Sequence, residues 1–276
     1  MPYKIILFLT LSFQCLSQKS LNVMTFNIRY ATAADGENQW ENRKELVAKT
    51  ISYYEADICG LQEATEPQVL FLAKKLSNYK WVGLGRDDGK SGGEFSPVFY
   101  NSSVLELVRW ETIWLSKTPN VPSKDWDAAL PRIATITHFK RKSDNRKFVA
   151  INTHYDHMGE VARQESSKLI LVNVQKYVKD RLKVILMGDF NSTPTDLPIT
   201  TFTNDILLNS MELSQTPHFG PVNSFTGFNS TEKENSQIDH IFVTKDIVVL
   251  KHATISETWN GRFASDHHAI QAKVKF

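Results

Sequence analysis

The chain has 276 residues, of which 41% are hydrophobic and 22% are charged, and its formal net charge is +2. These values are ordinary for a globular protein and exclude a chain that stays largely disordered. No global basic field indicates a polyanionic partner, although a local basic patch stays open. No change in composition and no linker rich in Pro, Gly or Ser divides the chain, so we expect one large domain rather than two small ones.

The first 17 residues have the pattern of a secretory signal peptide. Lys4 precedes an apolar block at 5–13 that is too short to span a bilayer, and the small residues Cys15 and Ser17 precede a cleavage point ahead of Gln18. We therefore predict a signal peptide at 1–17, a single domain at 18–276, and a secreted or periplasmic protein. Loss of Lys4 with the leader lowers the formal net charge from +2 to +1.

Only one cysteine remains in the predicted mature chain. Cys59 lies in the apolar run 58–61, which predicts a buried thiol and no internal disulfide. A lipoprotein acylated at Cys15 is the weaker alternative, because Phe13 and Gln14 are bulky at positions where small residues are required.

The predicted elements alternate between strands and helices along the chain. In order they are a strand at 21–29, a helix at 40–54, a strand at 57–63, a helix opening at Thr65-Glu66-Pro67, strands at 79–85, 95–100, 104–115, 132–139 and 148–154, a helix at 160–179, a strand from 184, a weak helix at 198–208, and strands at 237–244, 247–255 and 269–274. They form two blocks, roughly 21–140 and 147–276. This pattern predicts an α/β fold, a four-layer α/β/β/α sandwich in which two mixed sheets pack face to face with helices outside.

The stretch 184–192 is the clearest single signal. An apolar run suited to a strand buried on both faces ends abruptly in Asp189 and Asn191. Alternation along a strand sends these two side chains to one side and Phe190 back into the core. A carboxylate and a carboxamide at the end of a rigid strand can hold water or a hard cation. The plainer alternative is an Asx turn in which both side chains cap their own backbone.

Polar residues interrupt or end other apolar strands in the same way. A single such residue usually faces solvent, caps a turn or pairs in a loop. A set of eight at predicted strand ends favours one functional site at one edge of the fold: Asn27, Glu63, His154, Asp189, Asn191, Asp239, Asp266 and His267.

The motifs around these residues resemble, in order, those of the endonuclease/exonuclease/phosphatase family, which includes deoxyribonuclease I, deadenylases and sphingomyelinases. The resemblance covers nearly all of the mature chain and rests on Thr25-Phe26-Asn27, Leu61-Gln62-Glu63, Asn152-Thr153-His154, Gly188-Asp189-Phe190-Asn191, Ile238-Asp239-His240-Ile241-Phe242 and Ser265-Asp266-His267. It implies an α/β sandwich, a divalent cation and phosphoester hydrolysis.

The resemblance also implies a metal site that holds Mg²⁺ or Mn²⁺. Glu63 would be the main metal carboxylate, with Asn27 close by, and Asp266 could join a second metal site. Magnesium retains several water ligands, so one glutamate with amides and water is an adequate set. A zinc site at His154, Asp156 and His157 is the weaker alternative, because no Cys and no HExxH-type pair supports it.

Catalytic roles follow from the same resemblance. Asp189 would orient or deprotonate the attacking water, and Asn191 would hold that water and the phosphate. His267, oriented by Asp239, would contact the phosphate, and His154 would stabilise the phosphate from the other side. The identity of the formal base stays open.

The expected substrate is a phosphodiester, with nucleic acid one candidate, which makes a secreted nuclease-type hydrolase acting as a monomer the first hypothesis. Ser192 and His240 stand where inositol polyphosphate phosphatases tend to carry arginine, which disfavours that subgroup. Arg86 either binds a substrate phosphate or pairs with Asp87 or Asp88.

Three alternatives stay open: a sphingomyelinase-like enzyme with a membrane-facing hairpin at 110–126, a small-molecule phosphodiesterase or phosphatase, and an inactive binding module. The presence of Glu63, Asp189 and His267 argues against the inactive module.

Overall fold

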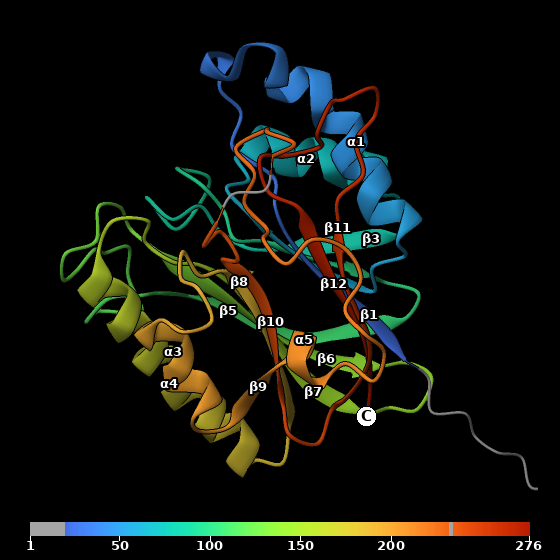
Figure 1. The fold of residues 1–276 in the computed structure, drawn as a ribbon. Helices are drawn as coiled ribbons and strands as arrows, with labels where there is room; N and C mark the ends of the chain where they lie inside the picture. The colour runs from blue at the N-terminus through green and yellow to red at the C-terminus, as the bar shows by residue number, and fades with distance from the viewer. Residues whose placement is uncertain (1–19, 232–233) are drawn as a thin grey trace, which may run out of the picture.

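The computed structural model describes residues 20–231 and 234–276, in which two six-stranded sheets lie face to face with helices on their outer sides (Figure 1). The predicted signal peptide and its cleavage point lie outside the described residues. The elements are β1 (Leu21–Asn27), the 3-10 helix η1 (Ala33–Asn38), α1 (Trp40–Tyr53), β2 (Ile58–Gln62), α2 (Glu66–Lys75), β3 (Tyr79–Val82), β4 (Val98–Asn101), β5 (Leu105–Trp114), β6 (Ile133–Arg141), β7 (Lys147–His154), α3 (Glu160–Lys179), β8 (Lys183–Asp189), α4 (Leu197–Thr203), β9 (Leu207–Asn209), α5 (Ser210–Leu213), β10 (Asp239–Thr244), β11 (Val248–Ile255) and β12 (Ala269–Lys275).

The two sheets share one plan. The first has the strand order β11-β12-β1-β2-β4-β3 and the second β5-β6-β7-β8-β10-β9. Each has a single parallel pair at its centre, β1 with β2 and β7 with β8, and antiparallel pairs on both sides. The predicted four-layer sandwich of two mixed sheets is confirmed.

The sheets do not follow the two sequence blocks, and this expectation was wrong. β11 and β12, from the end of the chain, belong to the first sheet, and β5 and β6, from the first block, belong to the second. The reason is backbone hydrogen bonding: β1 is bonded to β2 on one edge, and its other edge is satisfied by β12, which pairs Thr25 with Ile270.

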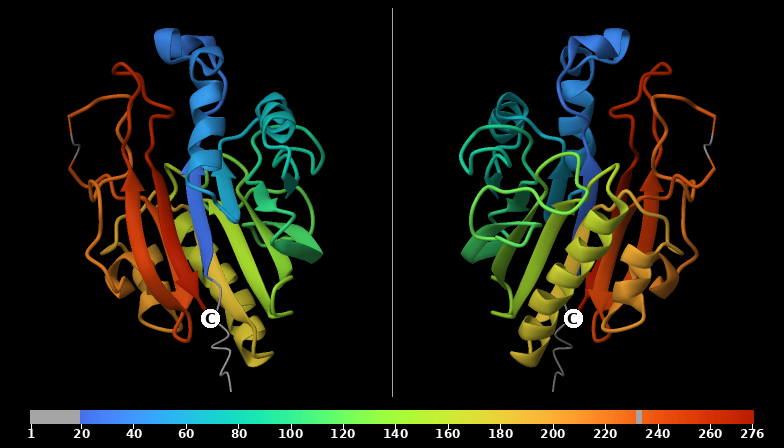
Figure 2. Two further views of the ribbon diagram at one scale, coloured as in Figure 1. Left: turned by 90° about the vertical axis from the view of Figure 1, so that its right-hand side faces the viewer. Right: turned by 90° about the vertical axis from the view of Figure 1, so that its left-hand side faces the viewer.

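Three separate cores account for the four layers. Val23 and Met187 belong to the core between the sheets, whereas Met24 on β1 packs under α1 and α2, and Leu186 on β8 packs under α3 and α4. Adjacent residues of one strand therefore face different cores, as the period of two requires. In Figure 1 α1 and α2 lie at the top and α3 and α4 at the lower left, and the right-hand view of Figure 2 looks onto α3 in front of the strands.

The predicted start of the helix at Thr65-Glu66-Pro67 is confirmed. α2 begins with a capping box between Thr65 and Gln68 and has Pro67 in its first turn. The short elements η1, β9 and α5 were not predicted, because they span only 3–6 residues each and carry little periodicity. Among residues 20–231 and 234–276 no helix has the length and apolar character needed to cross a membrane.

A buried polar clip joins the sheets near the site. The Asn152 amide on β7 donates to the backbone oxygens of Leu61 (2.8 Å) and Pro97 (2.9 Å) and accepts from Gln62 Nε2 (2.6 Å). Gly60 permits this approach, because a Cβ there would lie 2.5 Å from Asn152 Oδ1. The clip fixes the ends of β2 and β7, and the residues after them, relative to each other.

Candidate active site

The site forms where strands of opposite direction meet at one edge of the sandwich. His154 and Asp189 are paired at the ends of the parallel strands β7 and β8, and Asp239 is paired with Asp189 across β10. Asp239 begins its strand rather than ending it, because β10 runs antiparallel to β8. Likewise Asp266 and His267 precede β12. The prediction that these motifs end strands was wrong in direction, yet the antiparallel pairing brings them to the same edge.

A cavity of about 530 Å³ lies at this edge. It is lined by Arg29, Tyr30, Glu63, Glu94, Leu130, Arg132, His154, His157, Asp189, Asn191, Phe225, Ile238, Asp266 and His267. Six of the predicted site residues line it, and Asn27 and Asp239 are held behind it by hydrogen bonds to members of the lining.

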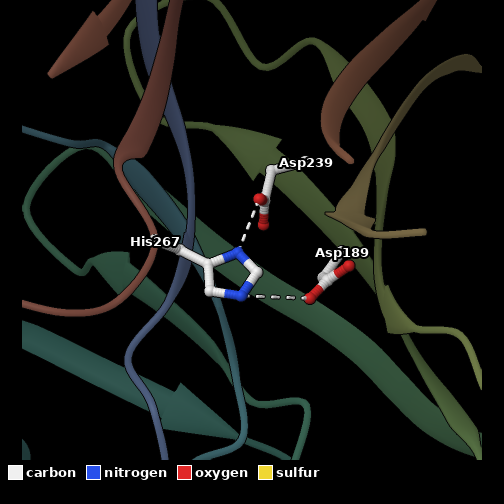
Figure 3. Close-up of side chains that lie close together, drawn as sticks. All are labelled: Asp189, Asp239 and His267. Atoms are coloured by element: carbon white, nitrogen blue, oxygen red, sulfur yellow. Dashed lines mark hydrogen bonds and ion pairs between the residues drawn. The ribbon is translucent and has the colours of Figure 1, made fainter. Parts of the chain in front are cut away.

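His267 lies between two buried carboxylates (Figure 3). Its Nδ1 donates to Asp239 Oδ2 at 2.8 Å, and its Nε2 lies 3.8 Å from Asp189 Oδ2. Burial alone favours the neutral ring, but the charges of Asp239, Asp189 and Asp266 outweigh it and raise the pKa of His267 to about 10. The imidazole is therefore held in its charged form near neutral pH.

Asp189 has the opposite shift. Burial, together with the neighbouring carboxylate of Asp239, raises the pKa of Asp189 above the usual aspartate range, and His267 opposes this. Asp189 Oδ1 also accepts the backbone N–H of Asn191 at 2.9 Å, which is the Asx turn of the plainer alternative. The turn and the site coexist, because the second oxygen, Oδ2, faces Asn27 and His267.

Asn27 links the two sheets at the cavity floor. Its amide nitrogen donates to Glu63 Oε1 (3.0 Å) and Asp189 Oδ2 (2.9 Å), and its oxygen accepts from the Arg29 backbone (3.0 Å). In this orientation Asn27 presents a donor, not a metal-binding oxygen, to the two acids. Glu63 follows β2 with a left-handed backbone (φ 59°), and its Oε2 accepts the N–H of Tyr30 at 3.2 Å.

The donor set of the cavity fits a hard divalent cation. Glu63 and Asp266 both line the cavity, and each Glu63 oxygen accepts one hydrogen bond and retains a free lone pair. Asp189, Asp239 and His267 also have ligand atoms close enough together to hold a metal ion. A metal there would have to displace the proton of His267, which the surrounding carboxylates stabilise. The chemistry therefore favours Glu63 and Asp266 as the ligands.

His154 and Asn191 form the side of the cavity next to Asp189. Asn191 Nδ2 donates to the backbone oxygen of Tyr155 (3.0 Å) and lies 3.3 Å from His154 Nε2. Burial lowers the pKa of His154 well below its usual value, and the charges of Arg132 and Arg86 add to this. His154 is thus a neutral ring that donates or accepts a hydrogen bond.

Arg86 forms an ion pair with Asp87, one of the two alternatives predicted for it, but its main partner is Glu94, which was not predicted. Arg86 is 7% exposed, does not line the cavity, and forms two hydrogen bonds with Glu94, at 2.7 and 3.0 Å. Asp87 lies farther away, at 3.8 Å. The prediction missed Glu94 because the two residues are eight positions apart in an irregular loop, where no periodicity indicates a pair.

The zinc alternative receives no support from geometry. Asp156 accepts hydrogen bonds from the backbone of Ala129, Leu130, Met158 and Gly159, and from Arg132 Nε at 3.1 Å. His157 Nδ1 lies 2.9 Å from the Arg132 guanidinium. Asp156 thus organises two loops and is not available to a metal.

Eight residues of the cavity lining were not among the predicted site residues: Arg29, Tyr30, Glu94, Leu130, Arg132, His157, Phe225 and Ile238. Arg29 pairs with Asp35 at 3.0 Å and lies 3.8 Å from Glu63 and 3.9 Å from Asp266. Its position two residues after Asn27 was a usable signal. Arg132 and Phe225 carried none, since their contacts are long-range.

Comparison with known proteins agrees with the site. The sequence model of the Endonuclease/Exonuclease/phosphatase family matches residues 24–267. This chain belongs to that family. The endonuclease/exonuclease/phosphatase chain is 30% identical over 235 residues to an uncharacterized protein of Acanthamoeba polyphaga mimivirus, covering 81% of this chain and 80% of the relative. The predicted family and its phosphoester hydrolase class are confirmed.

Two further relatives differ in their reactions. The mannosyl-6-phosphatase of Bacteroides thetaiotaomicron superposes with a TM-score of 0.89 at 34% identity, covering 93% of this chain and all of that one. The exoribonuclease subunit Ccr4 of the CCR4-Not complex of Mycosarcoma maydis is 23% identical over 93% of this chain, which spans about half (50%) of that relative. The family thus supplies both phosphatase and nuclease relatives for this chain.

Proposed function

We propose that this chain is a divalent-metal-dependent phosphoesterase that releases phosphate from a small, hydroxyl-rich organic ester such as a sugar phosphate. The proposed reaction rests on one observation: the His267 ring lies between the carboxylates of Asp239 and Asp189 on the wall of a cavity. The substrate class is supported by the similarity to the mannosyl-6-phosphatase, which extends over nearly the whole chain.

The chain's own residues supply the proton transfers. Asp189, with its raised pKa, accepts a proton from the attacking water as the water oxygen bonds to phosphorus. His267 uses Nδ1 to bind Asp239, so its Nε2–H donates a hydrogen bond to the phosphate. As the ester P–O bond breaks, the Nε2 proton is transferred to the departing oxygen. Asn191 and His154 hold the opposite side of the phosphate. A divalent cation at Glu63 and Asp266 would neutralise phosphate charge.

Arg29 completes the charge arrangement. Its Nε and one terminal nitrogen are hydrogen-bonded to Asp35, and Nε also lies 3.9 Å from Asp266. The other terminal nitrogen has no hydrogen bond within the described residues and lies 3.8 Å from Glu63, and Arg29 lines the cavity. A guanidinium held by one edge in this way can bind a phosphate oxygen with its free edge.

A panel of substrates tests the proposal. In the presence of magnesium, phosphate release would be measured with hexose 6-phosphates and p-nitrophenyl phosphate. Phosphodiester cleavage would be measured with bis-p-nitrophenyl phosphate, single-stranded DNA, RNA and sphingomyelin. We expect the highest kcat/KM for hexose phosphates, with Asp189→Asn as the inactive control. No phosphoester hydrolysis above that control would disprove the proposal.

A nuclease is the second candidate, because the relative named as an exoribonuclease aligns with 93% of this chain. Oligonucleotide cleavage exceeding hexose phosphate hydrolysis in the same panel would favour it. Secretion or export to the periplasm, implied by the leader at 1–17, is also part of the proposal.

A further inference from the structure

We propose that Glu94, held in place by Arg86, is a specificity residue of this site: its carboxylate accepts hydrogen bonds from hydroxyl groups of the esterified alcohol and disfavours substrates that carry a second phosphate there. This inference rests on the proposed function. It reverses the role predicted for Arg86, which positions the carboxylate instead of contacting the substrate.

The arginine fixes the plane of the carboxylate. Arg86 NH1 and NH2 bond to Glu94 Oε2 and Oε1, and the Arg86 backbone N–H donates to the Glu94 backbone oxygen at 3.1 Å. The Arg86 backbone oxygen in turn accepts from Trp114 Nε1 at 2.7 Å. Because both ends of the arginine are anchored, the carboxylate is presented rigidly to the cavity.

Glu94 is close to the reacting groups but separate from them. Its Oε2 lies 3.8 Å from His154 Nδ1, and the other nitrogen of that ring lies 3.7 Å from Asp189 Oδ2. One imidazole therefore separates the carboxylate from Asp189. A group attached to a phosphate bound near Asp189 reaches Glu94 within the length of a small molecule.

The chemistry of this wall suits hydroxyl groups. Each Glu94 oxygen accepts one hydrogen bond from Arg86 and retains a lone pair, so two neighbouring hydroxyls can donate to the carboxylate. The next cation, Arg132, is already paired with Asp156 at 3.1 Å. One terminal nitrogen of Arg132, NH1, has no hydrogen-bond partner within the described residues, but the charge of each arginine is already balanced by its own carboxylate. A second phosphate placed against Glu94 would therefore meet a like charge.

The simpler alternative is a structural ion pair that only stabilises the loop at 83–97. The two roles differ in how a charge-removing substitution affects substrates that share the phosphate but not the hydroxyls. A structural pair would lower activity equally on both substrates, whereas a specificity residue would change their ratio.

The decisive experiment compares Glu94→Gln with wild type on mannose 6-phosphate and p-nitrophenyl phosphate, at saturating magnesium. We expect kcat/KM to fall by about tenfold or more for the sugar phosphate, because a charged hydrogen-bond acceptor is lost, and to change less than about threefold for the nitrophenyl ester. Activity on fructose 1,6-bisphosphate relative to mannose 6-phosphate should rise severalfold. Glu94→Asp, which retains the charge, should restore part of the ratio.

Asp144→Asn is the matched control. Asp144 also forms two hydrogen bonds with a buried arginine, Arg141, but it does not line the cavity, so both substrates should keep the wild-type ratio. Thermal unfolding of each variant checks the fold. An unchanged ratio in a folded, active Glu94→Gln enzyme overturns the inference alone. Wild-type enzyme inactive on every hexose phosphate overturns the proposed function, and the inference falls with it.

Discussion

His267 Nδ1 donates a hydrogen bond to Asp239 Oδ2 at 2.8 Å, which joins a residue of the second sheet to the segment that leads into a strand of the first. Asp239 begins β10 in the second sheet, and His267 lies two residues before β12 of the first. The bond thus joins the two sheets at the cavity and sets both the orientation and the charge of the imidazole.

Substitutions of this pair should affect the same step. His267→Ala should lower kcat by about 10²–10⁴-fold, with a smaller effect on KM, because acid assistance acts mainly in the transition state. Asp239→Asn should cost less, since the amide still orients the ring. In steady-state kinetics the double variant should be scarcely worse than His267→Ala. Losses that multiply would show that the two residues act independently.

The pH dependence of kcat/KM should be bell-shaped, because this parameter reports the ionisation of the free enzyme. Asp189 must be deprotonated to accept a proton, and burial and Asp239 raise its pKa. As the pH is lowered, activity should therefore be lost at a higher pH than an ordinary aspartate would cause. His267 must be protonated, so activity should fall as pH rises through about 10. Asp239→Asn should move this alkaline limb to lower pH, because a charge that stabilises the imidazolium is removed. If the alkaline limb occurs at the same pH in Asp239→Asn as in the wild type, a group other than His267 is responsible for it.

Metal dependence should follow the chemistry of Glu63. EDTA should abolish hydrolysis, and magnesium or manganese should restore it. Glu63→Gln should weaken magnesium affinity, measured by calorimetry in the absence of substrate, because it removes a charged oxygen ligand. The fold should persist, as circular dichroism would show. Full activity in EDTA would contradict the metal site.

The Asn152 clip should matter for stability. Asn152→Ala removes three buried hydrogen bonds, those with the oxygens of Leu61 and Pro97 and with the Gln62 amide, and each such bond contributes about 0.5–1.5 kcal/mol. We expect a loss of roughly 3 kcal/mol or more in urea unfolding. Asn173→Ala, whose amide bonds only within α3, is the control and should change stability far less. Equal losses of unfolding free energy in the two variants would show that the Asn152 hydrogen bonds stabilise the fold no more than an ordinary side-chain bond in a helix.

The mature amino terminus tests the predicted leader. Mass spectrometry of protein from its native host should find a chain that begins near Gln18 or Lys19, outside the cytoplasm. An intact Met1 would refute both the cleavage and the proposed location.

The sequence alone determined the strand faces and the identity of the polar residues at the site. Alternation along a strand is a local property, and the structure follows it at β1, where Val23 and Met24 lie in different cores on opposite faces. It also placed Asp189 toward the site and Phe190 in the core. The order of the motifs then indicated the family before any contact was known.

Only the tertiary structure decided which strands share a sheet and which side chains meet. Strand pairing is satisfied by any suitable edge, so nothing local shows that β12 joins β1. Arg86 has acidic neighbours at positions 87 and 88, yet it binds Glu94, because the loop folds back through backbone hydrogen bonds such as Asp87 N–H to Gly92 oxygen. Asn27 and Asp189 form a hydrogen bond although they are 162 positions apart in the sequence. The packing of the two sheets against each other, rather than sequence spacing, brings them together.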